Sequence, residues 1–381
     1  MALLAWPKTS ECIVVDFSLT EEQLLLRESV QKYIQRAGGV ERHRTLMAGA
    51  EGFDPAAWAT FAELGWLALP FAAADGGLDG SATDLMVLCE ALGQGVVREP
   101  LLHTVITCGA LLASLAPQAL RQTYLPGLMA GERQWAFAFA ERGSGYSWDS
   151  IEASASGDAD SLFLSGTKIS VLNGHIADYL LVTALVGHEP ALLLLDANSP
   201  GISRNDFTAV DGSRGAHLTF DAVAATLVCH LSSTALEQAL APAIIAMAAE
   251  GVGAMQVLLD ATVEYTKTRE QFGQPIGRFQ ALQHRMADMY LKLEETRSLL
   301  YNAAILTDEC SEEAPAARAG LKVKLAEASR FVSHEAVQLH GGIGMTDELI
   351  VGHLFKRLLL LSKLYGDGDY HLERYLQLRV A

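Results

Sequence analysis

The stretch TREQFGQPIGRFQ, residues 268–280, decides the fold because it separates two long segments of helical character. An apolar run from Leu236 to Tyr265 precedes it and stops at Gly273 and Pro275. Apolar residues at helical spacing resume from Phe279 to Leu300. We therefore predict two long helices joined by a turn.

A second break, QLHGGIG at residues 338–344, ends a helix predicted from about Pro315. Its adjacent glycines, Gly341 and Gly342, allow a flat or phosphorylated ligand to approach the backbone closely. The first break adds the guanidinium of Arg269, which suits phosphate oxygens. Together the two breaks predict a site for a ligand with phosphates and a polar ring edge.

The helix before the first break begins at Leu236 or Pro242 and is apolar almost all round as far as Thr268. A helix without a polar face is typical of the centre of a bundle or of an oligomer. We therefore expect the protein to self-associate.

The amino-terminal part, from Thr20 to about Gly131, also has a helical pattern. Thr20 precedes acidic residues that suit a first helical turn, and Asp54 with Pro55 forms an N-cap followed by a suitable first residue. Ser81 or Thr83 begins a further helix after a glycine-rich break.

The pattern changes from helical to strand-like at Trp135. Short apolar runs alternate with Gly, Asp, Asn and Ser, which is typical of a compact antiparallel β domain. The predicted strands cover residues 135–139, 151–155, 162–164, 169–172, 179–183, 191–195, 217–220 and 225–228.

Length and composition narrow the class of protein. A chain of 381 residues with 50% hydrophobic residues indicates two or three domains with large cores. The net charge of −17 argues against nucleic acid or an anionic membrane as the main partner. Five scattered cysteines, without metal-type spacing, are typical of reduced core residues in a cytoplasmic protein, and no metal site or membrane span is expected.

The run TREQFGQPIGRFQALQHRMADM followed by QLHGGIGMTDE resembles the carboxyl-terminal signature of the acyl-CoA dehydrogenase family. The resemblance covers nearly the whole chain and implies an α+β fold in three parts. These are an amino-terminal helical domain (residues 1–132), a middle β-barrel domain (133–232) and a carboxyl-terminal four-helix bundle (233–381). It also implies a dimer or tetramer.

The family resemblance implies FAD, held between two subunits. Arg269 and Phe272 match the family's positions on the adenosine diphosphate arm, and Gln280 follows them at the family's distance. Gln338, Gly341 and Gly342 match the family's positions on the pyrophosphate side. Along the flavin ring, WAFAFAERGSGYS matches the family at Glu141, Gly143 and Gly145. Ser170 stands where the family usually has an aromatic residue, so ring stacking there is expected to be lost.

The base that would remove the substrate's α-proton is missing from both of the family's customary positions. Gly366 stands at the first of them, and Ala243 stands at the second. Two carboxylates nearby are candidates: Asp367, which also suits an ordinary turn, and Glu250, which also suits a buried ion pair with Arg or Lys. A third interpretation is that another chain supplies the base, as in heteromeric family members that lack the glutamate in one subunit.

The resemblance implies FAD-dependent α,β-dehydrogenation of an acyl-CoA thioester, possibly within a heteromer with a paralogous subunit. An electron-transfer flavoprotein is the expected electron acceptor. Two alternatives stay open: a non-catalytic flavin-binding partner subunit, and a flavin monooxygenase or oxidase on the same scaffold.

Overall fold

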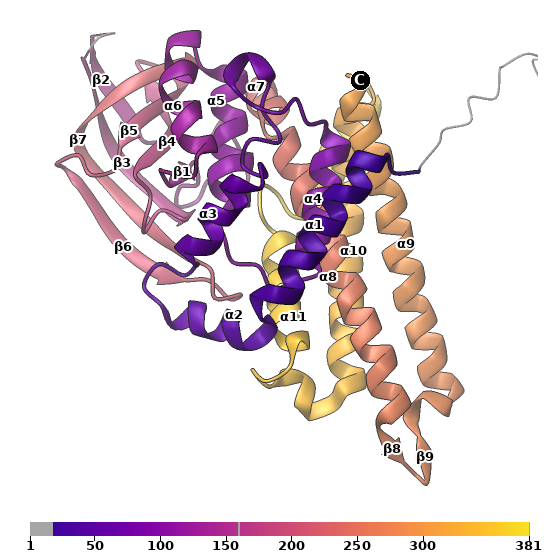
Figure 1. The fold of residues 1–381 in the computed structure, drawn as a ribbon. Coiled ribbons are helices and arrows are strands. Elements are labelled where there is room, and N and C mark those ends of the chain that lie inside the picture. Colours follow the sequence, from indigo (N-terminus) through magenta and orange to yellow (C-terminus); the bar gives the residue numbers. More distant parts are fainter. Residues whose placement is uncertain (1–17, 159–160, 381) are drawn as a thin grey trace, which may run out of the picture.

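The computed structural model describes residues 18–158 and 161–380, and it has three parts (Figure 1). The amino-terminal part is helical. Its elements are α1 (Glu21–Ala37), α2 (Gly39–Ala48), α3 (Pro55–Glu63), η1 (Ala73–Asp75), α4 (Ala82–Gly93), the π-helical η2 (Leu101–Gly109), α5 (Ala110–Leu115) and α6 (Gln118–Met129).

The predicted helix starts are confirmed, and each has a side-chain cap. Thr20 and Gln23 form a reciprocal capping box at the start of α1, and Ser81 with Asp84 does the same for α4. The Asp54 side chain accepts from Ala56 N at 3.0 Å at the start of α3. These caps use backbone N–H groups that have no partner within the helix.

The middle part is a closed β barrel. Its strands are β1 (Trp135–Ala138), β2 (Ser154–Asp158), β3 (Ser161–Leu172), β4 (Tyr179–Val186), β5 (Glu189–Asp196), β6 (Ile202–Thr208) and β7 (Arg214–His230). The order β4-β2-β3-β7-β5 returns to β4, while β1 and β6 pair on the outside with β4 and β7. The two strands predicted at 162–164 and 169–172 are parts of one long strand, β3. The two predicted at 217–220 and 225–228 are likewise parts of β7, and β6 was not predicted.

The carboxyl-terminal part contains α7 (Ser233–Ala239) and a bundle of long helices. These are α8 (Ala241–Thr268), α9 (Gln280–Asp308), α10 (Ala314–His340) and α11 (Ile350–Leu361), with α12 (Gly368–Val380) packed on α10. The small β8 (Glu270–Gln271) and β9 (Gln274–Pro275), with η3 (Ile276–Arg278), connect α8 to α9, and η4 (Gly341–Met345) follows α10.

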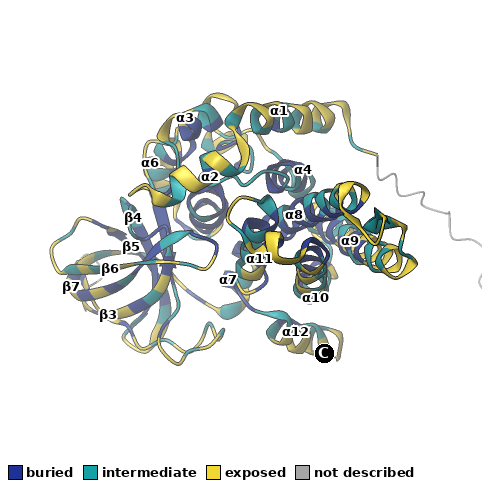
Figure 2. Cartoon of the chain, turned by 90° about the horizontal axis from the view of Figure 1, so that it is seen from below, coloured by how far each residue is buried: buried dark blue, intermediate teal, exposed yellow. Residues whose placement is uncertain are grey.

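Helix α8 lies at the centre of the molecule (Figure 2). It is long and apolar enough to cross a membrane by composition, but most of that stretch is buried inside the protein, as expected for a core helix. Two glycines let α4 and α8 approach at backbone distance. A Cβ at Gly93 would lie 2.2 Å from Glu250 O, and one at Gly253 would lie 2.1 Å from Glu90 O.

The expectation that the cysteines are core residues holds for Cys89 and Cys108, which are buried. It is wrong for Cys310, which is exposed in the turn after α9, while Cys229 is half-buried. Cys12 lies outside the described residues. No disulfide joins the described cysteines.

Candidate functional site

A cavity of about 310 Å³ lies between the β barrel and the segment that joins α11 to α12. Its size is at the lower end of the range for small-molecule pockets. Its walls are mainly apolar and aromatic. The lining residues are His103, Phe137, Phe139, Ala140, Gly145, Tyr146, Ser170, Leu172, Lys363, Leu364 and Tyr365. We refer to it as the ring cavity.

The barrel side of the ring cavity is fixed by a buried ion pair. Lys168 Nζ donates to Glu141 Oε1 at 2.5 Å, to Phe139 O at 3.1 Å and to Thr183 Oγ1 at 3.0 Å. The Glu141 carboxylate also accepts from the backbone N–H groups of residues 152 and 153. Burial lowers the pKa of Lys168, and its contact with Glu141 opposes that shift. Glu141 therefore holds the loop in place and does not line the cavity, whereas Gly145 does.

Ser170 lies on a β-bulge that points it into the ring cavity. The pairing of β3 with β7 shifts register between Lys168 and Val171, and Ser170 has a φ of +55°. Its backbone N–H donates to His217 Nδ1 at 3.1 Å. Bulges are frequent beside functional sites because they redirect a side chain.

The opposite wall is formed by Tyr365, which is held at both ends. Its hydroxyl lies 3.1 Å from Thr107 Oγ1, and its carbonyl accepts from His371 Nε2 at 3.0 Å. The buried Lys322 donates to the carbonyl of Leu364 at 2.9 Å. Burial is the main cause that lowers the pKa of Lys322, to about 7, and that of His371, to about 4. The segment is thus a rigid wall.

Gly366, at the first customary position of the base, has no room for a side chain. Its φ is +114°, which L-residues rarely adopt. A Cβ there would lie 2.4 Å from Tyr370 Cδ1 and 2.6 Å from His371 Nε2. Ala243, at the second position, is fully buried in α8. Neither position can present a carboxylate to the ring cavity.

Asp367 is used to begin α12 and does not line the ring cavity. Its Oδ1 accepts from Tyr370 N at 3.1 Å, and its Oδ2 accepts from Lys363 Nζ at 3.1 Å. The bond from Tyr370, followed by the contact with Lys363, lowers the pKa of Asp367. Its side chain borders a separate cavity between α10 and α11. These contacts favour a turn and capping role over proton abstraction.

Glu250 forms the ion pair with an arginine that the sequence offered as one of its two interpretations, and both side chains are half-buried, at 20% exposed. Arg357 Nε donates to Glu250 Oε1 at 2.6 Å, and Arg357 Nη2 donates to Oε2 at 2.9 Å. Arg357 Nη1 also donates to Asp211 Oδ2 at 3.0 Å. Burial opposes the charged form of Arg357, but the two carboxylates outweigh it and raise its pKa. Both Glu250 oxygens accept from Arg357, and Glu250 does not line the ring cavity.

The residues expected at the phosphate arm of FAD lie elsewhere, on the exposed end of the bundle. Tyr265 and His340 stack with ring centroids 4.5 Å apart and so bring the ends of α8 and α10 together. The two breaks that follow these helices are neighbours in space. Phe272 is 91% exposed, and Arg269, Gln280, Gln338, Gly341 and Gly342 are exposed too. In Figure 1, the β8–β9 hairpin lies far from the barrel, at the tip of the bundle.

The two sets of residues suit the two ends of FAD. The ring cavity is apolar, half enclosed and edged by the open backbone of Gly145, so a flat ring with polar edges fits it. The bundle tip offers the Arg269 guanidinium and the open glycine pair, which suit phosphates. The distance between barrel and tip within one chain is consistent with a cofactor shared by two chains.

Sequence reasoning missed His103, which lines the ring cavity from η2. Burial, followed by the charge of Arg357, lowers the pKa of His103 to about 3. The available signal was the polar pair Arg98-Glu99 followed by Pro100 and His103 within an apolar stretch. π-Helical turns such as η2 often occur at functional sites. No cluster of metal-ligating side chains occurs among residues 18–158 and 161–380.

Comparisons with known proteins agree with this geometry. Three family models match: the amino-terminal (residues 20–132), middle (136–223) and carboxyl-terminal (233–377) domains of acyl-CoA dehydrogenase. The acyl-CoA dehydrogenase IpdE2 of Mycolicibacterium smegmatis is 30% identical over 358 residues, which cover 93% of this chain and 98% of IpdE2.

Two solved structures are similar over nearly their whole length. The ChsE4-ChsE5 complex from Mycobacterium tuberculosis gives a TM-score of 0.87 at 26% identity, covering 96% of this chain and 99% of that one. The FAD complex of PigA gives 0.85 at 26% identity, covering 96% and 100%. With its three matching domains in order, the chain belongs to the acyl-CoA dehydrogenase family of FAD-dependent oxidoreductases that act on CH–CH bonds.

Proposed function

We propose that this chain is one subunit of a heteromeric FAD-dependent acyl-CoA dehydrogenase, and that a partner chain of the same family carries the catalytic glutamate. One observation carries the proposal: no described residue that lines the ring cavity is a carboxylate. Dehydrogenation of an acyl-CoA needs a base for the α-proton in a desolvated pocket.

In this proposal the bundle tip serves the partner's cofactor. Arg269 binds phosphate oxygens, and Gln338 with Gly341 and Gly342 binds the pyrophosphate side. Phe272 covers the adenosine part, which gives a role to its almost complete exposure in the isolated chain. The bound cofactor supplies hydride acceptance, and electrons then pass to an electron-transfer flavoprotein.

Within the chain's own ring cavity, the residues position a ring and exclude water. Gly145 and its neighbours present backbone groups to the ring edge, and Tyr365 closes the opposite side. Lys363 brings a positive charge to the cavity wall, but its Nζ donates a hydrogen bond to Asp367. The cavity thus offers binding without a proton acceptor of suitable pKa.

Purification of the tagged chain from its native host tests the proposal. We expect a second acyl-CoA dehydrogenase chain to co-elute, the complex to be yellow, and its colour to bleach anaerobically with an acyl-CoA. The chain expressed alone should not bleach. Bleaching by the chain alone, as a homo-oligomer, would refute the proposal.

A further inference from the structure

The short segment between α11 and α12, residues 362–367, forms one wall of the ring cavity. We refer to it as the wall segment. Its residues Lys363, Leu364 and Tyr365 line that cavity. It begins where α11 ends and leads into α12, the last helix that the structure describes. A movement of these few residues would therefore open or close the ring cavity.

The backbone of the wall segment is strained. Tyr365 has a φ of +54° and Gly366 has a φ of +114°, so two consecutive residues lie in a region that L-residues rarely adopt. For a bulky residue such as tyrosine this conformation costs roughly 1–3 kcal/mol, and strain of this kind is common in switch regions. The segment keeps this shape only because other contacts hold it.

Two basic side chains provide those contacts. Lys322 Nζ donates to Leu361 O at 3.0 Å and to Leu364 O at 2.9 Å. His371 Nε2 donates to Tyr365 O at 3.0 Å, since a carbonyl oxygen only accepts. Consecutive carbonyls of the wall segment are thus held by one base from α10 and one base from α12.

Both bases are buried, and neither touches a carboxylate. Lys322 is 0% exposed and His371 is 8% exposed. Among residues 18–158 and 161–380, no ion pair reaches either side chain. Asp367 and Lys363, which are bonded to each other, act on Lys322 only from longer range and with opposite signs. Asp367 also favours a charged His371, and Lys322 opposes it.

The other elements packed here bring no free negative charge. Glu237 of α7 is paired with Arg374 of α12 at 2.7 Å. Arg318 of α10 lines the same small cavity as this pair and His371. These groups leave an excess of positive charge beside His371, which also disfavours its protonation.

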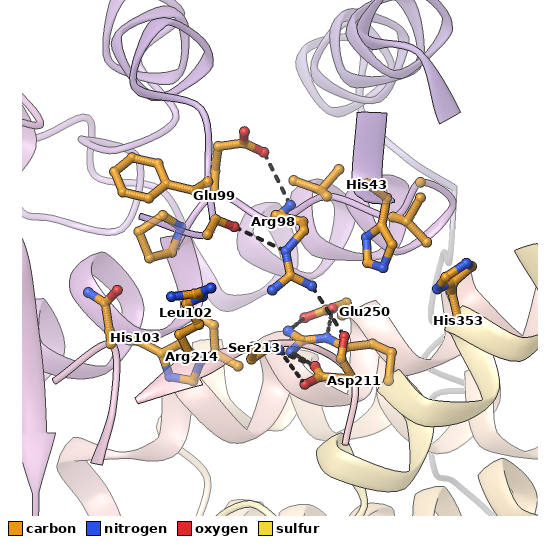
Figure 3. A pocket seen from close by; sticks show the side chains of 18 of the residues that line it. His43, Arg98, Glu99, Leu102, His103, Asp211, Ser213, Arg214, Glu250 and His353 are labelled. Carbon is orange, nitrogen blue, oxygen red and sulfur yellow. Dashed lines mark hydrogen bonds and ion pairs between the residues drawn. The ribbon is translucent and has the colours of Figure 1, made fainter. Parts of the chain in front are cut away.

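The buried charges where the three parts of the chain meet are arranged differently. Figure 3 shows Arg98, Asp211 and Glu250 around that cavity. Arg357 is bonded to both carboxylates there, and they raise its pKa despite burial. Lys322 lacks such a bonded counter-charge, and burial lowers its pKa to about 7.

Opening of the wall segment would bring both bases into water, which favours their charged forms. In the closed segment, burial lowers the pKa of Lys322 to about 7 from an ordinary value of 10.5, and that of His371 to about 4 from 6.5. The open segment therefore binds an extra proton at Lys322 between about pH 10 and pH 7, and at His371 between about pH 6.5 and pH 4. In both ranges a lower pH favours opening.

We propose that the wall segment is a gate of the ring cavity that opens by taking up protons at Lys322 and His371. Opening frees the carbonyls of residues 361, 364 and 365 and relieves the strain at Tyr365. The closed gate keeps water from a bound ring, and the open gate lets the ring enter or leave. Lys322 and His371 are positioning residues that act through Tyr365. All groups of the gate belong to this chain, so the inference does not depend on a partner subunit.

Hydrogen–deuterium exchange of the full chain, with its cofactor and with any partner that co-purifies, tests the proposal. Mass spectrometry follows peptides that cover residues 361–371 from pH 9 to pH 5, with exchange corrected for the intrinsic effect of pH. We expect the equilibrium constant for opening to rise about fiftyfold from pH 9 to pH 7 and about twentyfold more from pH 7 to pH 5. These peptides should exchange faster than those of α8 at every pH, which separates opening of the gate from global unfolding.

Variants assign each part of the pH dependence. Lys322→Met should remove the rise between pH 9 and pH 7, and His371→Gln should remove the rise between pH 7 and pH 5. The matched control is Lys324→Met, also on α10 but paired with Glu295, which should leave both rises unchanged. Lys363→Met, at an exposed position, serves if Lys322→Met does not fold. The charge of Lys363 lowers the pKa of Lys322, so its removal should move the lower end of the first rise above pH 7.

Release of FAD connects the gate to the cavity. FAD dissociation, followed by its fluorescence, should accelerate from pH 9 to pH 7 in parallel with the exchange, and Lys322→Met should lose this acceleration. Exchange that does not change with pH would overturn the inference, and so would exchange as slow as that of α8. Exchange that rises while FAD release stays constant would also overturn it, because the moving segment would then not control the ring cavity.

Discussion

Restoring the missing glutamate by Gly366→Glu should damage the fold instead of creating a dehydrogenase. The substitution places a Cβ 2.4 Å from Tyr370 and 2.6 Å from His371, at a φ of +114°. Backbone strain of this kind costs about 1–3 kcal/mol, and overpacking adds about 1–3 kcal/mol. The sum, about 2–6 kcal/mol, is a large part of a typical stability of about 5–15 kcal/mol.

Thermal unfolding, followed by circular dichroism, should therefore show a Tm lower by on the order of 3–8 °C for a chain of 381 residues. Gly366→Ala separates the steric contribution from the effect of charge and should lose most of the same stability. Gly187→Ala is the matched control, because Gly187 also has a positive φ, +66°, but has no heavy atom within 4 Å of the added Cβ. It should cost only about 1–2 kcal/mol.

Two results would refute the reasoning. One is equal destabilisation by Gly366→Ala and Gly187→Ala, which would mean that the neighbouring rings move aside without cost. The other is a stable Gly366→Glu chain that, purified alone with FAD, bleaches with an acyl-CoA. That result would show that only the carboxylate was missing from a functional site.

Four further predictions concern single groups. Glu250→Gln should lower the free energy of unfolding by about 1–3 kcal/mol, because Arg357 loses one of its two charged partners and keeps only Asp211. Chemical denaturation measures this, and a change under about 1 kcal/mol would contradict it. Asp367→Asn should change the stability by less than about 1 kcal/mol, because Asn caps a helix about as well as Asp, and should leave the FAD content and bleaching of the complex intact. Abolished bleaching would make Asp367 the base. Arg269→Ala should weaken FAD binding in the complex about tenfold or more, measured by the flavin retained after dialysis, and unchanged retention would count against the phosphate contact. The pKa of His371 is lowered to about 4, so below about pH 6.5 the unfolded chain binds a proton at this residue more readily than the folded chain does. The free energy of unfolding should therefore fall as the pH drops from about 6.5 toward 4, and the loss from this group should reach about 2 kcal/mol at pH 5. His371→Gln should flatten the pH dependence of unfolding.

The sequence alone determined the elements that depend on local chemistry. The caps at Thr20, Asp54 and Ser81 mark helix starts because a side chain and a backbone N–H only a few residues apart satisfy each other. The apolar residues on nearly all sides of α8 predicted a core helix, and most of its residues are indeed buried in the bundle. The two breaks at 268–280 and 338–344 predicted neighbouring ligand-binding segments, and the stacking of Tyr265 on His340 brings them together.

Tertiary structure decided what each polar residue does, because pairing and burial depend on residues far apart in the chain. Sequence left Glu250 open between a base and an ion pair, and only the approach of α11 supplies Arg357, 107 residues away. The residues next to Asp367 in the sequence suit a base and a turn equally well. Its bonds to Lys363 and Tyr370 exist only once α12 forms. The cavity where the three parts of the chain meet is lined by histidines from each part, among them His43, His175 and His353. No spacing in the sequence could reveal that cavity, because packing alone brings those side chains together.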